Sequence, residues 1–332
     1  MSTESAGIQG GSSPALVCVS HSPIIMIRAK APKEEPEILK HYEQCVDGIE
    51  QFAPEQIIVF GADHFAGFPL SCMPAHCVGL ACDAVDDVGG FPGRLDVPMP
   101  MATALVEHLR NDDFDTAVSY KMRVDHGFSQ PLKRLTGALD RYPTIPVFIG
   151  ALAPPLLPFR RSRMLGDSIG RFVRRSGRRT LFVGSGGLSH HPTRYYPLVG
   201  DGDPEVAAYQ LEGERGGSFT DEQWLKRLHD MHVEGADMLI SGTRTRQDIR
   251  LNPEIDRQFM EQLCRDDLHE FDLWNTSDLV EKAGIGFLEV HAWIAAVAAY
   301  RAAGGSAPSR RTYAPTLEYG IGYGMLDAGL CK

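Results

Sequence analysis

Short apolar stretches rich in β-branched residues alternate along the chain with longer segments whose apolar residues recur every three or four positions. Five short stretches predict buried strands, at residues 15–20, 56–61, 116–120, 145–150 and 180–184. Four longer segments have the spacing of helices, at residues 35–52, 100–110, 130–139 and 164–175. This alternation favours an α/β fold, in which a mostly parallel central sheet is covered by helices on both faces.

The pattern changes in the last third of the chain. From about residue 203 to 303 the apolar spacing is helical almost throughout and predicts no strand, so this part is expected to pack on the sheet as helices. Residues 301–311 are typical of a loop, and residues 313–326, rich in Tyr and Gly, predict turns or a short strand. Residues 1–13 are small and polar and predict a disordered tail.

Length and composition are those of a globular protein. The 332 residues are 43% apolar and 23% charged, and they predict one domain over residues 14–332. Its α/β part would span about 14–200 and its mainly helical part about 201–332. With 33 basic and 43 acidic residues the formal net charge is −10, which argues against a nucleic-acid partner.

The sequence also bears on the compartment. No apolar run approaches the ~18 residues that a membrane span needs, and the first residues lack the basic and apolar regions of a signal peptide. The seven cysteines include no C-x-x-C pair, which disfavours a disulfide framework or a structural zinc site. We therefore expect a cytoplasmic protein with no membrane partner.

Histidines follow the ends of four predicted strands. The segments are Ser20-His21-Ser22-Pro23, Ala62-Asp63-His64, Val124-Asp125-His126-Gly127 and Leu188-Ser189-His190-His191. One such histidine alone is more simply interpreted as part of the core, but ligands of open α/β sheets gather at the carboxyl ends of the strands. Two imidazoles and one carboxylate with open positions suit non-haem Fe(II), and two further histidines would be available as acid and base.

A carboxylate is required to complete such a ligand set. The best candidate is Glu289, which lies near the start of an otherwise apolar helical segment that continues through Trp293. An acidic residue at this place either faces water, where the helix dipole favours it, or faces inward as a ligand. Spacing alone leaves both interpretations open.

At these residues the sequence resembles a known family, the class III extradiol ring-cleavage dioxygenases of the protocatechuate 4,5-dioxygenase β-subunit superfamily. The likeness extends from about Ala15 to Met325 and is strongest to the branch that acts on 2,3-dihydroxyphenylpropionate. The motifs that carry it are Ser-His-Ser-Pro at 20–23, Asp-His at 63–64, Val-Asp-His-Gly-Phe-Ser-Gln-Pro-Leu at 124–132 and Gly-Ser-Gly-Gly-Leu-Ser-His at 184–190.

The resemblance implies a role for each candidate residue. His21, His64 and Glu289 would be the ligands of Fe(II). His126 and His190 would form the catalytic pair, one as acid and one as base, and Asp125 would orient His126. The implied reaction is meta cleavage of a substituted catechol by O₂, with both oxygen atoms inserted, in the degradation of aromatic compounds. Family members assemble into multimers, so a homo-oligomer is expected.

The sequence departs from the branch it resembles most at the tail, at about residues 193–250 and around Glu289. These departures leave the substrate open: 2,3-dihydroxyphenylpropionate, protocatechuate, gallate and methylgallate are all candidates, as are both positions of cleavage. Two other functions also remain open. One is a binding module that keeps the scaffold without catalysis, and the other is a zinc-dependent hydrolase on the same ligands.

Two further patterns are interpreted as structural. His232 and Glu234 form the H-x-E part of another iron motif, but that motif belongs on a strand, whereas His229, His232 and Glu234 predict a solvated helix face. Eight arginines from Arg160 to Arg179 are typical of the wet side of a helix, although such a cluster could attract an anionic aromatic acid or an acidic neighbouring subunit.

Overall fold

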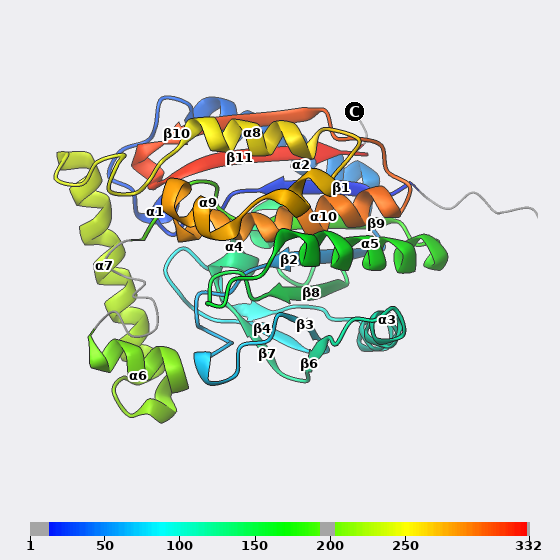
Figure 1. Cartoon of the computed structure of the whole chain (residues 1–332), viewed down its shortest axis with the longest axis horizontal. Helices are drawn as coiled ribbons and strands as arrows, with labels where there is room; N and C mark the ends of the chain where they lie inside the picture. Colours follow the sequence, from blue (N-terminus) through cyan, green and yellow to red (C-terminus); the bar gives the residue numbers. More distant parts are fainter. Residues whose placement is uncertain (1–12, 193–202, 331–332) are drawn as a thin grey trace, which may run out of the picture.

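A computed structural model describes residues 13–192 and 203–330 of the chain (Figure 1). The predicted tail lies outside these ranges except for residue 13, and the single-domain organisation stays a prediction. Among the described residues no helix is both long and apolar enough to cross a bilayer. The six cysteines in the described ranges are free thiols.

An eight-stranded sheet forms the centre of the molecule. Its strands are β1 (Ala15–Val19), β2 (Gln56–Gly61), β3 (His76–Gly79), β6 (Ala117–Ser119), β8 (Thr144–Ile149), β9 (Thr180–Ser185), β10 (Arg310–Thr316) and β11 (Ile321–Ala328). They lie in the order β10-β11-β1-β9-β2-β8-β3-β6. The four central strands, β1, β9, β2 and β8, are parallel, and antiparallel pairing joins β11 to β1 and β3 to β8. The predicted α/β class with a mostly parallel sheet is confirmed.

The central strands are apolar along their whole length because helices cover both faces of the sheet. On one face lie α2 (Glu35–Phe52) and α4 (His126–Thr136). On the other face lie α3 (Met99–Asn111), α5 (Phe159–Ser176), α8 (Pro253–Leu263) and α10 (Val290–Ala302). The C-terminal helices α8 and α10 therefore pack on the sheet, as the pattern predicted.

The C-terminal segment differs from its prediction. Turns or one short strand were expected over residues 313–326, but β10 and β11 form a long antiparallel pair beside β1. Gly320 does lie in a turn, with a φ of 72°, but Gly322 and Gly324 lie within β11, where other elements pack closely. A Cβ on Gly322 would lie 2.1 Å from an oxygen of Asp256, and one on Gly324 would lie 2.8 Å from Leu188.

A second, three-stranded sheet was not predicted. It consists of β4 (Cys82–Ala84), β5 (Gly93–Arg94) and β7 (Met122–Val124), in the order β5-β4-β7. The single strand expected at 116–120 is β6, at the edge of the main sheet, and the chain then turns into β7. Because β7 precedes Asp125, His126 comes from this small sheet. The prediction that all four histidines follow strands of one sheet is therefore wrong for His126.

Four helices lie at one end of the molecule or beside it: α1 (Ile24–Ile27), α6 (Pro204–Glu212), α7 (Asp221–Ser241) and α9 (Thr276–Ala283). Figure 1 shows α6 and α7 standing beside the main body, with α7 next to α1. The α6–α7 unit has a small apolar core of its own around Tyr209 and Trp224. Their rings are stacked, with centroids 4.3 Å apart.

The position of α10 is set by close packing against α5, which lies beside it in Figure 1. Every side chain of α10 from Val290 to Tyr300 is buried. Glycines at two positions of α5, one turn apart, face its backbone. A Cβ on Gly166 would lie 2.2 Å from the carbonyl oxygen of Ala295, and one on Gly170 would lie 2.3 Å from that of Ala299. The two helices are thus in backbone contact, which only glycine permits at these positions.

This packing predicts the effect of one added methyl group. Helix propensity alone favours alanine over glycine by about 1 kcal/mol. At position 170 the methyl group would instead push α5 away from Ala299. We expect Gly170→Ala to lower the free energy of unfolding by about 1–3 kcal/mol, measured by urea denaturation. Arg174→Ala, at an exposed position of the same helix, should change it by no more than about 0.5 kcal/mol. A gain in stability for Gly170→Ala would show that the helices have room between them.

Candidate active site

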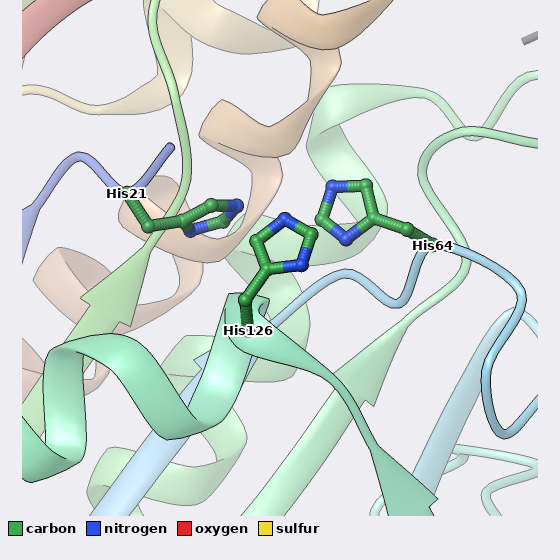
Figure 2. A group of neighbouring side chains, drawn as sticks. All are labelled: His21, His64 and His126. Carbon is green, nitrogen blue, oxygen red and sulfur yellow. The ribbon is translucent and has the colours of Figure 1, made fainter. Parts of the chain in front are cut away.

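A pocket lies where β1, β2 and β9 end. It holds about 1210 Å³ of space, including the part that opens to solvent, and the segments after all three strands line it. His21 follows β1, His64 follows β2 and His190 follows β9. Figure 2 shows the rings of His21, His64 and His126 converging on one space. Ring nitrogens of these three residues lie within 4.8 Å of one another, so they form a candidate metal-binding group.

Glu289 faces this space and not the solvent. It is the last residue of a short 3₁₀ helix, Ile285–Glu289, that leads into α10, and it is only 1% exposed. Its Oε2 lies 3.2 Å from Nε2 of His21, and its Oε1 lies 3.2 Å from Nε2 of His64. The backbone N–H of Gly187 donates to Oε2 at 2.6 Å. The carboxylate therefore faces inward, and its role as a metal ligand stays a prediction.

The start of α10 approaches β9 closely enough to place this carboxylate. A Cβ on Gly186 would lie 2.6 Å from the backbone oxygen of Glu289, so a larger residue there would displace the helix. The indole N–H of Trp293 donates to the carbonyl oxygen of Gly186 at 3.0 Å. The glycines after β9 therefore bring the first turn of α10 against the strand.

Hydrogen bonds fix the proton on the outer nitrogen of His21. The hydroxyl of Ser185 donates to the carbonyl of Gly127, so it accepts a hydrogen bond from Nδ1 of His21 at 2.9 Å. The other nitrogen, Nε2, is then a lone-pair donor that faces Glu289. It is buried, and no group among the described residues hydrogen-bonds it.

His64 is held in the same way by Asp125. The carboxylate of Asp125 accepts from Nδ1 of His64 at 3.1 Å and from its backbone N–H at 2.5 Å. Burial works to raise the pKa of Asp125, but the charge and hydrogen bonds of His64 lower it below its ordinary value. Burial works to lower the pKa of His64, but Asp125 and Glu289 raise it. With Nδ1 donating to Asp125, Nε2 of His64 is the nitrogen that faces Glu289.

The donor set fits a divalent transition metal. Nε2 of His21 and Nε2 of His64 each lie 3.2 Å from an oxygen of the Glu289 carboxylate, one on each oxygen. Ligands at right angles around an ion, with bonds of about 2.1 Å, lie about 3.0 Å apart. Burial works to raise the pKa of Glu289, but His21 and its neighbours lower it well below its ordinary value, so the carboxylate is ionised. A cation here would satisfy the buried lone pair of His21 and leave positions open toward the pocket.

His126 is oriented by Asp87, which the sequence did not suggest. Oδ2 of Asp87 is hydrogen-bonded to Nδ1 of His126, and both side chains are buried. The ring of His126 stacks on that of His64, with centroids 4.4 Å apart. The expected contact between Asp125 and His126 is wrong in detail, because Asp125 caps α4 and turns its carboxylate to His64. No motif pointed to Asp87, which lies in a loop far from His126 in the chain.

His190 presents a proton acceptor to the pocket. Its Nδ1 donates to the carbonyl of Leu188 at 2.7 Å, which leaves Nε2 with the lone pair, 3.6 Å from Oε1 of Glu289. Burial lowers the pKa of His190 below its ordinary value, although Glu289 opposes the shift. Asp256 of α8 holds the preceding residue, Ser189, by accepting from its N–H and hydroxyl.

Two other sequence interpretations are changed or refined. His232 of α7 lines the pocket and is not part of a solvated face, whereas His229 on the same helix is exposed. The arginine cluster lies mainly on the exposed side of α5, but Arg163 is buried and binds Asp272 with two nitrogens. Both features depend on which helix face is covered, which spacing alone did not reveal.

Comparisons with known proteins agree with this geometry. Residues 15–322 match the family described as the catalytic LigB subunit of aromatic ring-opening dioxygenase. The chain is 39% identical over 303 residues to a protein of Pseudomonas putida named 2,3-dihydroxyphenylpropionate/2,3-dihydroxicinnamic acid 1,2-dioxygenase 2, across 91% of this chain and 94% of that one. It is 35% identical to a protein of the same name from Dechloromonas aromatica, across 94% of this chain and 96% of that one.

A relative from Escherichia coli K12, named 2,3-dihydroxyphenylpropionate/2,3-dihydroxicinnamic acid 1,2-dioxygenase, is 37% identical across 94% of this chain and 98% of that one. Among solved structures, an uncharacterized protein from the same organism superposes with a TM-score of 0.50 at 14% identity, across 95% of this chain and 99% of that one. This last likeness concerns the fold alone.

The proposed ligand set predicts how metal affinity responds to loss of a ligand. We expect His21→Ala to weaken binding of Fe(II) or Co(II) by more than the about 10–100-fold that loss of a ligand's hydrogen-bond partner costs. Equilibrium dialysis under argon with metal analysis measures this. His229→Ala, at an exposed position of α7, is the control and should bind like the parent protein. Equal affinity of the two variants would rule out His21 as a ligand.

The two aspartates predict different effects on the metal. Asp125 contacts His64, a proposed ligand, whereas Asp87 contacts His126. We therefore expect Asp125→Asn to weaken metal binding about 10–100-fold and Asp87→Asn to leave it close to that of the parent protein. The same dialysis experiment compares them. The reverse ranking would place His126, and not His64, on the metal.

Proposed function

The chain belongs to the family of catalytic LigB subunits of aromatic ring-opening dioxygenases, and from this membership and the geometry of the pocket we propose that it opens a catechol ring by the extradiol route, with Fe(II) as its metal and O₂ as co-substrate. It is a ring-cleaving dioxygenase. The observation that carries the finer proposal is the meeting of His21, His64 and Glu289 at 3.2 Å on the floor of an open pocket that also holds two further histidines.

His21, His64 and Glu289 would hold the metal on one side and leave its other side to the pocket. Bound there, a ferrous ion would bring the two oxygens of the catechol and O₂ into contact. Ser185 and Asp125 keep the two imidazoles in the tautomer that such binding needs. Because both atoms of O₂ enter the product, the reaction needs no external reductant.

We assign the base to His190. A catechol must lose phenolic protons to bind as the dianion, and Nε2 of His190 is a buried lone-pair acceptor beside the proposed metal position. Its lowered pKa keeps the imidazole neutral at physiological pH and therefore able to accept a proton. The carbonyl of Leu188 would stabilise the imidazolium that forms.

We assign the acid to His126. Asp87 fixes its Nδ1, so the opposite nitrogen faces the space shared with His21 and His64. From that nitrogen the ring would deliver a proton to the substrate as the ring of the catechol opens. Asp87 would thus be the partner of the acid, and Asp125 the partner of a metal ligand.

For the substrate we propose a 2,3-dihydroxyphenyl acid such as 2,3-dihydroxyphenylpropionate, since the relatives named above carry this substrate or its cinnamic analogue in their names. Protocatechuate and gallate are the nearest alternatives. The pocket has apolar walls beyond the histidines, which favours a catechol that carries a side chain with apolar carbons.

Oxygen uptake with a panel of catechols tests the reaction and the substrate together. After anaerobic loading with Fe(II), we expect uptake and a yellow ring-opened product with 2,3-dihydroxyphenylpropionate, slower turnover of protocatechuate and gallate, and loss of activity after treatment with an iron chelator. Hydrolase activity restored by Zn²⁺, with no oxygen uptake, would contradict the proposal. Absence of turnover with every catechol and every metal would favour a binding module.

In the same assay, His190→Asn and His126→Asn should each lower kcat about 10²–10⁴-fold, with a smaller change in KM. His229→Ala again serves as the control, because its ring is exposed on α7. Loss of binding with unchanged kcat would show that the two rings only position the substrate.

A further inference from the structure

The wall of the pocket opposite the proposed metal position is one face of α7. The side chains that line it recur every three or four residues, so they form a single stripe along the helix. They are Trp224, Leu225, Leu228, Met231, His232 and Leu239. All but His232 are apolar, and Nδ1 of His232 donates to the carbonyl of Leu228 at 2.7 Å. This stripe offers carbon surface to a ligand and few groups that bind charge.

A basic side chain lies at the end of this wall. Arg244 follows α7, lines the pocket and is 9% exposed. Its backbone N–H donates to the carbonyl of Met238 at 2.9 Å, and its Nη2 donates to the carbonyl of His191 at 2.8 Å. These contacts hold the guanidinium beside the residue that follows His190. Its charge reaches His190, whose pKa it helps to lower.

Among the described residues, Arg123 also lines the pocket, but it has a different role. Arg123 precedes Val124 at the end of β7, and its side chain is 43% exposed. Its Nη2 binds Asp221, at the start of α7, at 2.7 Å, and Asp221 also accepts from the hydroxyl of Tyr209. Arg123 therefore joins the small sheet to α7 at the surface. An exposed ion pair of this kind is a weak site for a further anion.

Of the four acidic residues that line the pocket in the described part of the chain, Asp221 binds Arg123 and the other three contact histidines. Asp87 binds His126, Asp125 binds His64, and Glu289 contacts His21. Negative charge is thus concentrated at the floor, and the buried guanidinium lies at the wall. An elongated ligand with its catechol on the floor would have an anionic end directed to that wall.

We propose that Arg244 binds the carboxylate of the substrate's side chain, while the stripe of α7 contacts the carbons between ring and carboxylate. This inference rests on the proposed function, since it assumes that the catechol occupies the metal side of the pocket. A guanidinium binds carboxylates through charge-assisted, often paired hydrogen bonds, which are stronger where water is excluded. Arg244 is thereby a specificity-determining residue that selects acids over neutral catechols.

Binding under argon tests the proposal without turnover. Isothermal titration of the Fe(II)-loaded enzyme compares 2,3-dihydroxyphenylpropionate with 3-propylcatechol, which has the same ring and chain length but no carboxylate. We expect the parent protein to prefer the acid and Arg244→Gln to reduce that preference about 10–100-fold, as loss of a charged hydrogen-bond partner does. Arg244→Lys keeps the charge and should give an intermediate preference. The control is Arg123→Gln, which should leave the preference close to that of the parent protein.

The outcomes separate this proposal from the one it rests on. If the parent protein binds both catechols with equal affinity, or if Arg244→Gln weakens both equally, Arg244 does not recognise the carboxylate, whatever the oxygen-uptake assay shows. If Arg123→Gln abolishes the preference and Arg244→Gln does not, the anchor is Arg123. A preference for the acid that depends on Arg244, in a protein that opens no ring, would support this inference and contradict the proposed function.

Should Arg244→Gln fail to fold, a second comparison decides: the affinity of the parent protein for the acid and for its methyl ester. Equal affinity for the two compounds overturns the proposal.

Discussion

One buried carboxylate organises this protein. Glu289 lies at the start of a helix that is apolar on every side, and its carboxylate is surrounded by two imidazole nitrogens and a backbone N–H from three different parts of the chain. An ionised group in such surroundings is costly unless it is paired. The surrounding structure therefore has to position those partners next to the carboxylate, and much of the fold serves this purpose.

Short-range packing contacts and hydrogen bonds hold Glu289 and its partners in place. Glycines of α5 let α10 lie in backbone contact, and Gly186 lets the first turn of α10 meet β9. Behind the rings, Ser185 and Asp125 accept from the outer nitrogens of His21 and His64 and so direct the inner ones to Glu289. Each contact is local, yet together they connect β1 and β2 to a helix more than 200 residues later in the chain.

The sequence predicted the α/β class and the four central strands, because runs such as those of β1 and β2 are apolar without interruption. It also placed His21, His64 and His190 together, since the ends of parallel strands share one edge, although the roles assigned to them stay proposals. It missed the small sheet, whose strands are only two or three residues long and carry no periodicity.

The prediction of the site failed in two respects, because both depend on contacts between segments that only the fold brings together. Asp87 lies in an irregular loop and is brought to His126 only by the fold, so no spacing could reveal it. Asp125 is next to His126 in sequence, but as the residue that caps α4 it has an extended backbone, and its carboxylate turns toward His64. The family resemblance implied that Asp125 orients His126, but a motif does not determine the direction of a side chain.

The small sheet has a consequence of its own. It carries the segment that ends in His126, while the residues that surround Glu289 come from the large sheet and α10. The two sheets are joined behind the rings, because Asp125, which directly follows β7, accepts from His64 of the large sheet, and Ser185 at the end of β9 donates to Gly127. During evolution, substitutions around β4 and β7 would therefore disturb the rings of His126 and His64 together, so that the two rings are inherited as one unit.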